Sequence, residues 1–190
     1  MVLPVVQFGH PVLRQKGDRI EKISTEITQL IADMLETMHA ARGIGLAAQQ
    51  IGRALQLAVI DVRGISDRPS TLDWNDEPAD VEAFMPLVLI NPVVTPAGEP
   101  ATASEGCLSF PEMYAKIARP EAVSVSALDA QGKRVNFRCG GLLARAVQHE
   151  TDHLNGILFI DRMTRADKDE LRAELDELQA VTKAELKRKK

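Results

Sequence analysis

The feature that most restricts the fold of this chain is a pair of histidines at the end of an apolar segment. Residues 149–153 read HETDH. Four apolar residues lead into this pentapeptide: Leu142, Leu143, Ala146 and Val147. In a helix, His149 and His153 stand one turn apart on one face. Inward-facing imidazoles need partners, because burying unsatisfied polar groups is costly. We therefore expect a helix that presents both histidines to one metal ion, with Glu150 within reach of a bound water.

A hydrolytic metal site needs a third protein ligand and an open position for water. No histidine follows His153, which excludes the metzincin pattern. Three downstream glutamates, Glu170, Glu174 and Glu177, could supply the ligand of a thermolysin-like peptidase, but they fall on the polar face of an amphipathic helix. The upstream alternative is Cys107, which follows a glycine in the polar segment EGCLS at residues 105–109. We favour Cys107.

Small residues crowd a third segment, GIGLAAQQ at residues 43–50. Its glycines allow another backbone to approach closely, and Gln50 offers a side-chain amide. The GxG pair lacks the spacing of a dinucleotide-binding loop, so we do not expect a nucleotide there.

Apolar periodicity predicts an α+β fold in a single domain, residues 1–190. Ser24 is expected to cap a first helix that ends before Gly43, and Thr164 to open a C-terminal helix. We expect antiparallel or mixed sheets around the central HExxH helix. The predicted strands are Leu55–Val62, Pro86–Val94, Ala122–Leu128 and Lys133–Cys139, and the central helix is Leu142–Leu154.

The segment from Arg63 to Met85 shows no clear period, and we interpret it as a surface loop or insertion. Between Asp61 and Glu82 it holds seven acids and two arginines. Two alternatives remain open: a solvated excursion, or a border of the active-site mouth that influences which peptides enter.

Composition excludes several classes of function. A net charge of −4 and an aromatic content of 4% give neither a basic field nor stacking platforms for nucleic acid. No apolar run approaches the roughly 20 residues that span a bilayer, and no secretory signal is evident. Two cysteines are too few for a disulfide scaffold, so we expect a cytoplasmic protein.

Taken together, the three segments resemble the peptide deformylase family of bacteria and organelles. The family motifs GxGxAAxQ, EGCLS and QHExDH occur here in order, at residues 43–50, 105–109 and 148–153. The likeness extends from HPVLR at residues 10–14 to Asp161. One departure is Tyr114, where some family members carry an arginine.

The resemblance implies a metal-dependent hydrolase that removes the formyl group from the N-terminal methionine of new proteins and releases formate. It implies Cys107, His149 and His153 as ligands of one divalent metal ion, with Fe²⁺ as the native ion and Zn²⁺, Ni²⁺ or Co²⁺ able to substitute. Hydroxide on the metal attacks the formyl carbon, and Glu150 acts as general acid and base. The side chain of Gln50 and the backbone N–H of Leu108 stabilise the oxyanion.

By the same resemblance, the substrate is the formylmethionyl end of a nascent peptide. It should lie extended along Gly43, Ile44 and Gly45, where main-chain contacts are indifferent to sequence. Helical spacing places Leu142 and Arg145 on the face of His149. We assign Ile44, Leu142 and the stem of Arg145 to the methionine pocket, and expect the charged head of Arg145 in solvent.

The basic end of the chain, Lys187–Lys190 together with Lys183, suits a phosphate-rich surface and suggests contact with the ribosome. Two rival functions remain open at this point. One is an HExxH metallopeptidase, and the other is a non-catalytic, ribosome-associated metal-binding module. The intact EGCLS segment argues against the first, and Glu150, which a structural metal site does not need, argues against the second.

Overall fold

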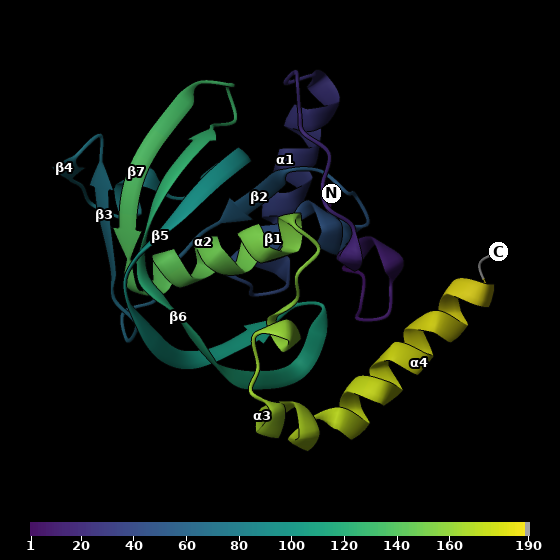
Figure 1. The fold of residues 1–190 in the computed structure, drawn as a ribbon. Coiled ribbons are helices and arrows are strands. Elements are labelled where there is room, and N and C mark those ends of the chain that lie inside the picture. The colour runs from purple at the N-terminus through teal and green to yellow at the C-terminus, as the bar shows by residue number, and fades with distance from the viewer. Residues whose placement is uncertain (189–190) are drawn as a thin grey trace.

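A computed structural model describes residues 1–188 of the chain (Figure 1). Its centre is one seven-stranded sheet of order β1-β2-β5-β6-β7-β3-β4, in which every pair of neighbours is antiparallel. The strands are β1 (Gly45–Ala47), β2 (Leu57–Ile60), β3 (Ser70–Trp74), β4 (Glu77–Pro78), β5 (Leu87–Cys107), β6 (Phe110–Leu128) and β7 (Arg134–Gly140). The predicted α+β class is confirmed, with an antiparallel sheet.

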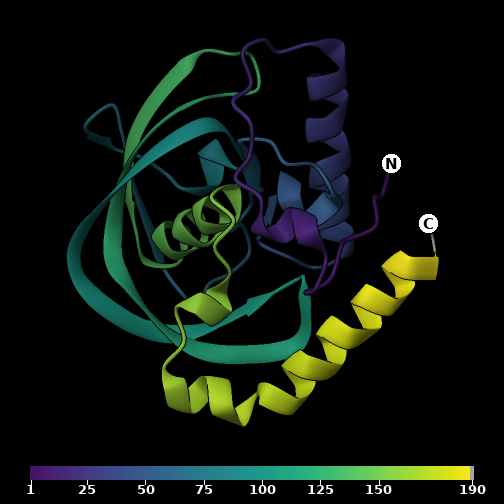
Figure 2. The same ribbon diagram turned by 45° about the vertical axis from the view of Figure 1, so that its right-hand side comes forward.

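The predicted central helix is present as α2 (Gly141–Leu154). Strands β5, β6 and β7 curve around it, so that the helix lies in the hollow of the sheet (Figures 1 and 2). Of its 14 residues, 12 are buried, including polar ones. Leu142, Leu143 and Val147 pack in one core cluster with apolar residues of β5, β6 and β7. This helix has almost no solvated face, which explains why its polar residues must find partners inside the protein.

The first helix, α1 (Thr25–Ala40), begins as predicted, with the Ser24 hydroxyl accepting from the N–H of Ile27. Its end differs in detail. Arg42, not Gly43, adopts the left-handed conformation, at φ 55°. The N–H of Gly43 reaches back to the carbonyl of Met38 at 2.9 Å, closing a Schellman motif. Gly43 therefore follows the turn and opens the segment that leads into β1.

Strands β5 and β6 form a long hairpin of which only the base was predicted. Pro96, Gly98 and Pro100 interrupt the apolar pattern of β5, because that part pairs on one edge alone and lies mostly exposed. The register shifts at Gly106/Cys107, where the hairpin turns. This bulge presents Cys107 at the tip of the strand, facing α2.

The prediction of a surface loop from Arg63 to Met85 was wrong. The segment forms β3, β4 and the 3₁₀ turn η3 (Glu82–Phe84), and β3 pairs with β7. Trp74 anchors it by stacking on Phe137, with ring centroids 5.4 Å apart. Short strands bearing several acids gave no alternating pattern long enough to recognise.

The same segment caps the central helix. The carbonyl of Pro69 accepts the N–H of Leu142 at 3.1 Å, and the hydroxyl of Ser70 accepts the N–H of Leu143 at 3.0 Å. No side chain of α2 or its own N-cap, Gly140, satisfies these amides. A segment remote in sequence therefore completes the N-terminus of α2.

After the turn η4 (Phe159–Asp161), the chain ends in α3 (Arg165–Glu170) and α4 (Arg172–Arg188). Thr164 caps α3 as predicted, accepting from the N–H of Asp167, but the expected single helix is broken at Leu171. Leu175 and Leu178 of α4 pack with Phe110 and Phe159. Lys189 and Lys190 lie outside the described residues. Within residues 1–188, no helix combines the length and apolar character needed to cross a membrane.

Removing the Ser70 hydroxyl tests the remote cap. We expect Ser70→Ala to lower the free energy of unfolding by about 1 kcal/mol, because the amide of Leu143 loses its acceptor. Urea denaturation measures this directly. Ser66→Ala, at an exposed position of the same segment, is the matched control and should change stability by less than about 0.5 kcal/mol. Equal effects of the two substitutions would contradict the cap.

Candidate metal centre

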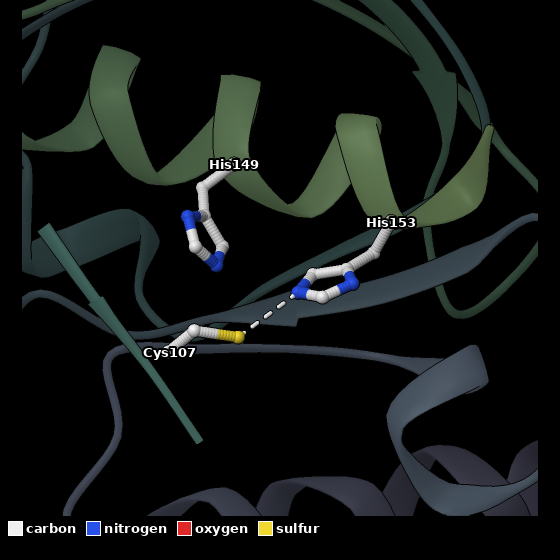
Figure 3. A group of neighbouring side chains, drawn as sticks. All are labelled: Cys107, His149 and His153. Carbon is white, nitrogen blue, oxygen red and sulfur yellow. Dashed lines mark hydrogen bonds between the residues drawn. The ribbon is translucent and has the colours of Figure 1, made fainter. Parts of the chain in front are cut away.

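Three side chains with soft or nitrogen donors converge below α2 (Figure 3). Cys107 comes from the tip of β5, and His149 and His153 come from successive turns of α2. One ligand atom from each lies within 4.8 Å of the others, and Cys107 Sγ is 3.3 Å from His153 Nε2. A thiolate and two imidazoles at this spacing suit a transition-metal ion with a fourth position open.

The competing third ligands do not take part. Glu170, Glu174 and Glu177 are exposed on α3 and α4, and the described residues contain no metal-ligand group that includes them. Cys139 is buried in the strand β7, where burial raises the pKa of its thiol to about 12. A neutral thiol of this kind is a core residue and not a metal ligand.

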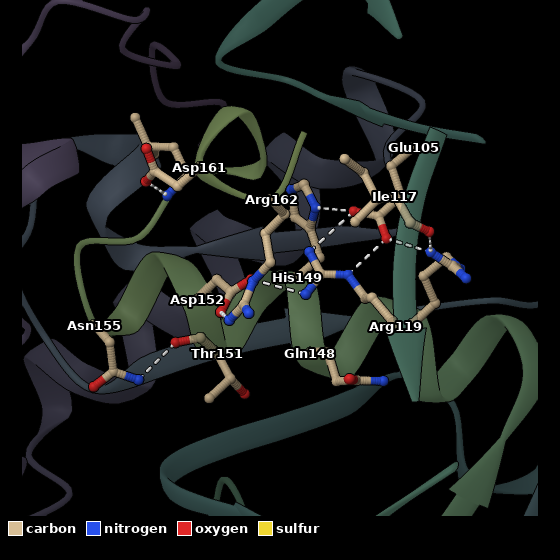
Figure 4. A network of polar contacts seen from close by, with 12 residues as sticks. Glu105, Ile117, Arg119, Gln148, His149, Thr151, Asp152, Asn155, Asp161 and Arg162 are labelled. Carbon is tan, nitrogen blue, oxygen red and sulfur yellow. Dashed lines mark hydrogen bonds and ion pairs between the residues drawn. The ribbon is translucent and has the colours of Figure 1, made fainter. Parts of the chain in front are cut away.

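Glu105 orients the first histidine (Figure 4). Its Oε2 lies 3.1 Å from His149 Nδ1, which directs the other ring nitrogen, Nε2, towards the Cys107 sulfur. Two arginines hold the carboxylate: Arg119 through Nε and Nη2 at 2.6 and 3.0 Å, and Arg145 through Nη1 at 2.7 Å. Burial alone would raise the pKa of Glu105, but the hydrogen bonds from His149 and Arg119 outweigh it and hold the pKa well below its usual range.

Arg119 carries the network one turn further along α2. Its Nη1 donates to Asp152 at 2.8 Å, and Asp152 also accepts from Arg162 at 2.5 and 2.9 Å. No motif pointed to Arg119, which is 2% exposed. The alternation of side chains along the strand could have predicted its burial, because Ala115, Ile117 and Arg119 share the inward face of β6.

The expectation that Arg145 turns its charged head to solvent was wrong. The guanidinium is buried, and besides Glu105 it donates to the carbonyls of Ile117 at 2.8 Å and Ala101 at 2.6 Å. These acceptors from β5 and β6 replace water, so burial of the charge is tolerated. Arg145 thus fastens α2 to both strands of the hairpin, one turn before His149.

Glu150 lies beside the cluster with its carboxyl group buried. Burial raises its pKa to about 7, and Oε2 has no hydrogen-bond partner among the described residues. The backbone of Gly45 lies against this carboxyl: a Cβ added there would stand 2.3 Å from Oε1. Glycine at position 45 is therefore what allows the carboxyl group and β1 to meet.

Gln50 and Leu108 flank Cys107. Gln50 Oε1 accepts the N–H of Ala47 at 2.9 Å, which turns Nε2 towards Cys107 Sγ at 3.5 Å. An N-terminal arm, residues 6–8, donates three hydrogen bonds to carbonyl oxygens of the segments that contain Gln50 and Leu108. The N–H of Val6 donates to Gln50 at 2.8 Å, Gln7 Nε2 donates to Leu108 at 3.4 Å, and the N–H of Phe8 donates to Ser109 at 2.9 Å. The arm fixes these donors relative to each other.

A pocket of about 760 Å³ opens in front of the cluster. Its lining includes Cys107, His149, Glu150, Gln50 and Leu108, and also every residue predicted to bind substrate: Gly43, Ile44, Gly45, Leu142 and Arg145. Tyr114 lies on its rim and is 63% exposed. From the segment at residues 63–85, Arg68 reaches the lining, so the segment does border the mouth.

Comparison with known proteins agrees with this geometry. The model of one family, polypeptide deformylase, matches residues 2–169. The chain belongs to the polypeptide deformylase family. The peptide deformylase of Opitutus terrae is 44% identical over 190 residues, covering 98% of each chain.

Solved deformylases share the fold. The enzyme of Thermus thermophilus superposes with a TM-score of 0.80 at 35% identity, over 95% of this chain and 99% of that one. The enzyme of Synechococcus elongatus, determined in complex with actinonin, gives 0.74 at 41% identity, over 95% and 85%. This deformylase is therefore a metal-dependent hydrolase that removes the N-formyl group from newly made proteins. The peptidase and binding-module alternatives are not favoured.

Neutralising Glu105 tests how far the site depends on it. In Glu105→Gln, Arg145 loses its carboxylate partner and Arg119 keeps only Asp152, so we expect the free energy of unfolding to fall by about 3 kcal/mol. Urea denaturation at pH 7 measures the change. Glu99→Gln, exposed on β5, provides the control. A loss below about 1 kcal/mol in the Glu105 variant would mean that the buried charges do not depend on this carboxylate.

Proposed function

We propose that this deformylase uses Cys107, His149 and His153 to hold one divalent metal ion, with Glu150 as its proton carrier. The observation that carries the proposal is a buried carboxyl group with a pKa of about 7 beside three converging ligands. The buried Oε2 of Glu150 has no protein partner among the described residues, as expected of an oxygen whose partner is a water molecule.

The donor set fits several metals. One thiolate and two imidazoles suit Fe²⁺, Zn²⁺, Ni²⁺ and Co²⁺ alike, because ligand softness alone does not choose among them. We propose Fe²⁺ as the native ion, with the others able to substitute. When bound, such an ion supplies Lewis acidity that activates a water molecule near neutral pH.

Glu150 moves the proton. As the water oxygen bonds to the formyl carbon, the carboxylate accepts the water proton. It then donates this proton to the methionine nitrogen as the C–N bond breaks. Formate and a free amino terminus result. A pKa of about 7 suits both directions of transfer at neutral pH.

Gln50 and Leu108 stabilise the charge that develops on the formyl oxygen. Gln50 Nε2 and the N–H of Leu108 flank Cys107, and donors fixed in such a place are each worth roughly 3 kcal/mol. The N-terminal arm supports this role, because Val6 and Gln7 contact the carbonyl oxygens of Gln50 and Leu108, the two residues that carry the donors.

The peptide lies extended along Gly43, Ile44 and Gly45, adding a strand at the free edge of β1. The methionine side chain enters the pocket beside Ile44, Leu142 and the stem of Arg145. Since Arg145 is anchored by its head, its stem forms a fixed part of the pocket floor.

Formate release from formyl-Met-Ala-Ser tests the mechanism. We expect Glu150→Gln to bind metal as the parent does but to lose more than about 100-fold in kcat, because the proton has no carrier. Metal content is assayed in both proteins, with Glu99→Gln as the control. An active, fully metallated Glu150→Gln would contradict the role of Glu150. An inactive, fully metallated parent would contradict deformylation itself.

We further propose that residues 1–190 form one catalytic domain, since α4 packs on the cluster that contains Phe110 of β6. We place the enzyme in the cytoplasm, because Cys107 is a free thiol and a thiolate ligand needs a reducing compartment.

The end of α4 is proposed to contact the ribosome. Lys183, Lys187 and Arg188 are exposed there and suit a phosphate-rich surface. Deleting residues 187–190 should weaken co-sedimentation with ribosomes severalfold at low salt and leave formate release intact. The substitutions Lys133→Gln and Arg134→Gln, at exposed positions distant in sequence, control for charge. Unchanged co-sedimentation of the deletion would exclude the tail as the contact.

A further inference from the structure

The outer part of the pocket carries positive charge that no protein group neutralises. Arg42 and Arg68 both line the pocket, and neither forms an ion pair within residues 1–188. The rest of the protein is acidic, with a net charge of −4. Nine charged residues lie between Asp61 and Glu82, seven of them acids, yet the one that reaches the pocket is an arginine, Arg68.

The backbone holds both arginines in place. Arg42 occupies the left-handed position of the Schellman motif, fixed by the bond from Gly43 N–H to Met38. Arg68 directly precedes Pro69 and Ser70, which cap the first amides of α2. Two cations therefore stand on fixed turns, one shortly before β1 and one beside the residues that cap the N-terminus of α2.

The direction of the peptide brings its later residues to these turns. Gly45 touches Glu150, so this end of the segment marks the reacting formyl group. Gly43 and then Arg42 follow outward along the chain. An extended peptide advances roughly 3.3 Å per residue. The second and third residues after the methionine therefore pass Arg42, while Arg68, which precedes the Pro69 that bonds the N–H of Leu142, lines the same pocket from the α2 side.

The other charges of the pocket do not cancel this field. Glu105 and Arg145 are buried and paired with each other, and Glu150 lies at the reacting end. Glu112 is the one acid on the exposed part of the lining. Two cations thus face one anion at the mouth, and an acidic side chain arriving there gains attraction from both arginines.

We propose that Arg42 and Arg68 form a subsite that favours formyl peptides with Asp or Glu at the second or third position after the methionine. The inference rests on the proposed function. It adds a preference for particular side chains to main-chain contacts that do not depend on the peptide sequence. Because the contacts lie far from the reacting carbon, they stabilise the ground state and the transition state alike, so the preference belongs in KM and not in kcat.

Peptides of the form formyl-Met-Ala-X-Ser-amide, with X as Glu, Gln or Lys, test the subsite. A companion series places X one residue later. The terminal amide prevents the arginines from binding a terminal carboxylate instead. At low salt we expect kcat/KM to favour Glu over Lys by about fivefold at one of these positions, through KM. The preference should fade at 1 M NaCl, where the screening length is about 3 Å.

The double substitution Arg42→Gln with Arg68→Gln should bring the Glu-to-Lys ratio below about twofold. The double substitution Arg134→Gln with Arg138→Gln makes the same charge change on β7, outside the pocket lining, and should leave the ratio as in the parent. Equal cleavage of all peptides by the parent, or a preference that survives in the double variant, would overturn the subsite. Failure to cleave any peptide would instead contradict the proposed function.

Discussion

The structure depends on one buried carboxylate, Glu105, and on the four contacts that occupy it. Oε1 accepts from Arg119 and Arg145, and Oε2 accepts from Arg119 and His149. These contacts join β5, β6 and α2, which are the three elements that build the site. Taking such charges out of water is expensive, and each is tolerated only because its partner is held in place. Asp152 adds a second carboxylate to this network of paired charges. It accepts from Arg119, which also binds Glu105, and it is paired with Arg162. The central helix can therefore lie inside the protein while carrying polar residues.

This arrangement also explains how the three proposed metal ligands meet. Cys107 lies two residues after Glu105 on β5, and His149 receives its orientation from Glu105. Glu105 thus orients the helix ligand through its side chain, while the bulge that follows it on β5 presents the strand ligand. Glu150 has the opposite environment: its carboxyl group is buried without an arginine partner, and its pKa rises to about 7. The pKa values of the two glutamates shift in opposite directions, because hydrogen bonds from His149 and Arg119 lower that of Glu105, whereas desolvation is the largest effect on Glu150.

Much of the centre could be predicted from the sequence, because its signals are local. The spacing of His149 and His153 requires only a helix, and EGCLS and GIGLAAQQ each lie in one continuous segment. The parts that were missed depend on distant contacts. The partners of Arg145 come from β5 and β6, and the remote cap of α2 comes from Pro69 and Ser70. Arg119 could have been found by following strand alternation from Ile117, but its acid partners lie 14 and 33 residues away in sequence. Short acidic strands such as β3 carry too little periodicity to be recognised alone.

The central claim is that one sulfur and two imidazole nitrogens, one of which is oriented by Glu105, form the metal site. X-ray absorption at the zinc edge of the zinc-loaded enzyme tests this most directly. The account predicts one sulfur at about 2.3 Å and two nitrogens at about 2.0 to 2.1 Å, with the remaining scatterer a light atom. The sulfur should disappear in Cys107→Ser, whereas it should remain in Cys139→Ser. A spectrum with no sulfur in the parent, or one in which the sulfur survives the Cys107 substitution, would contradict the account.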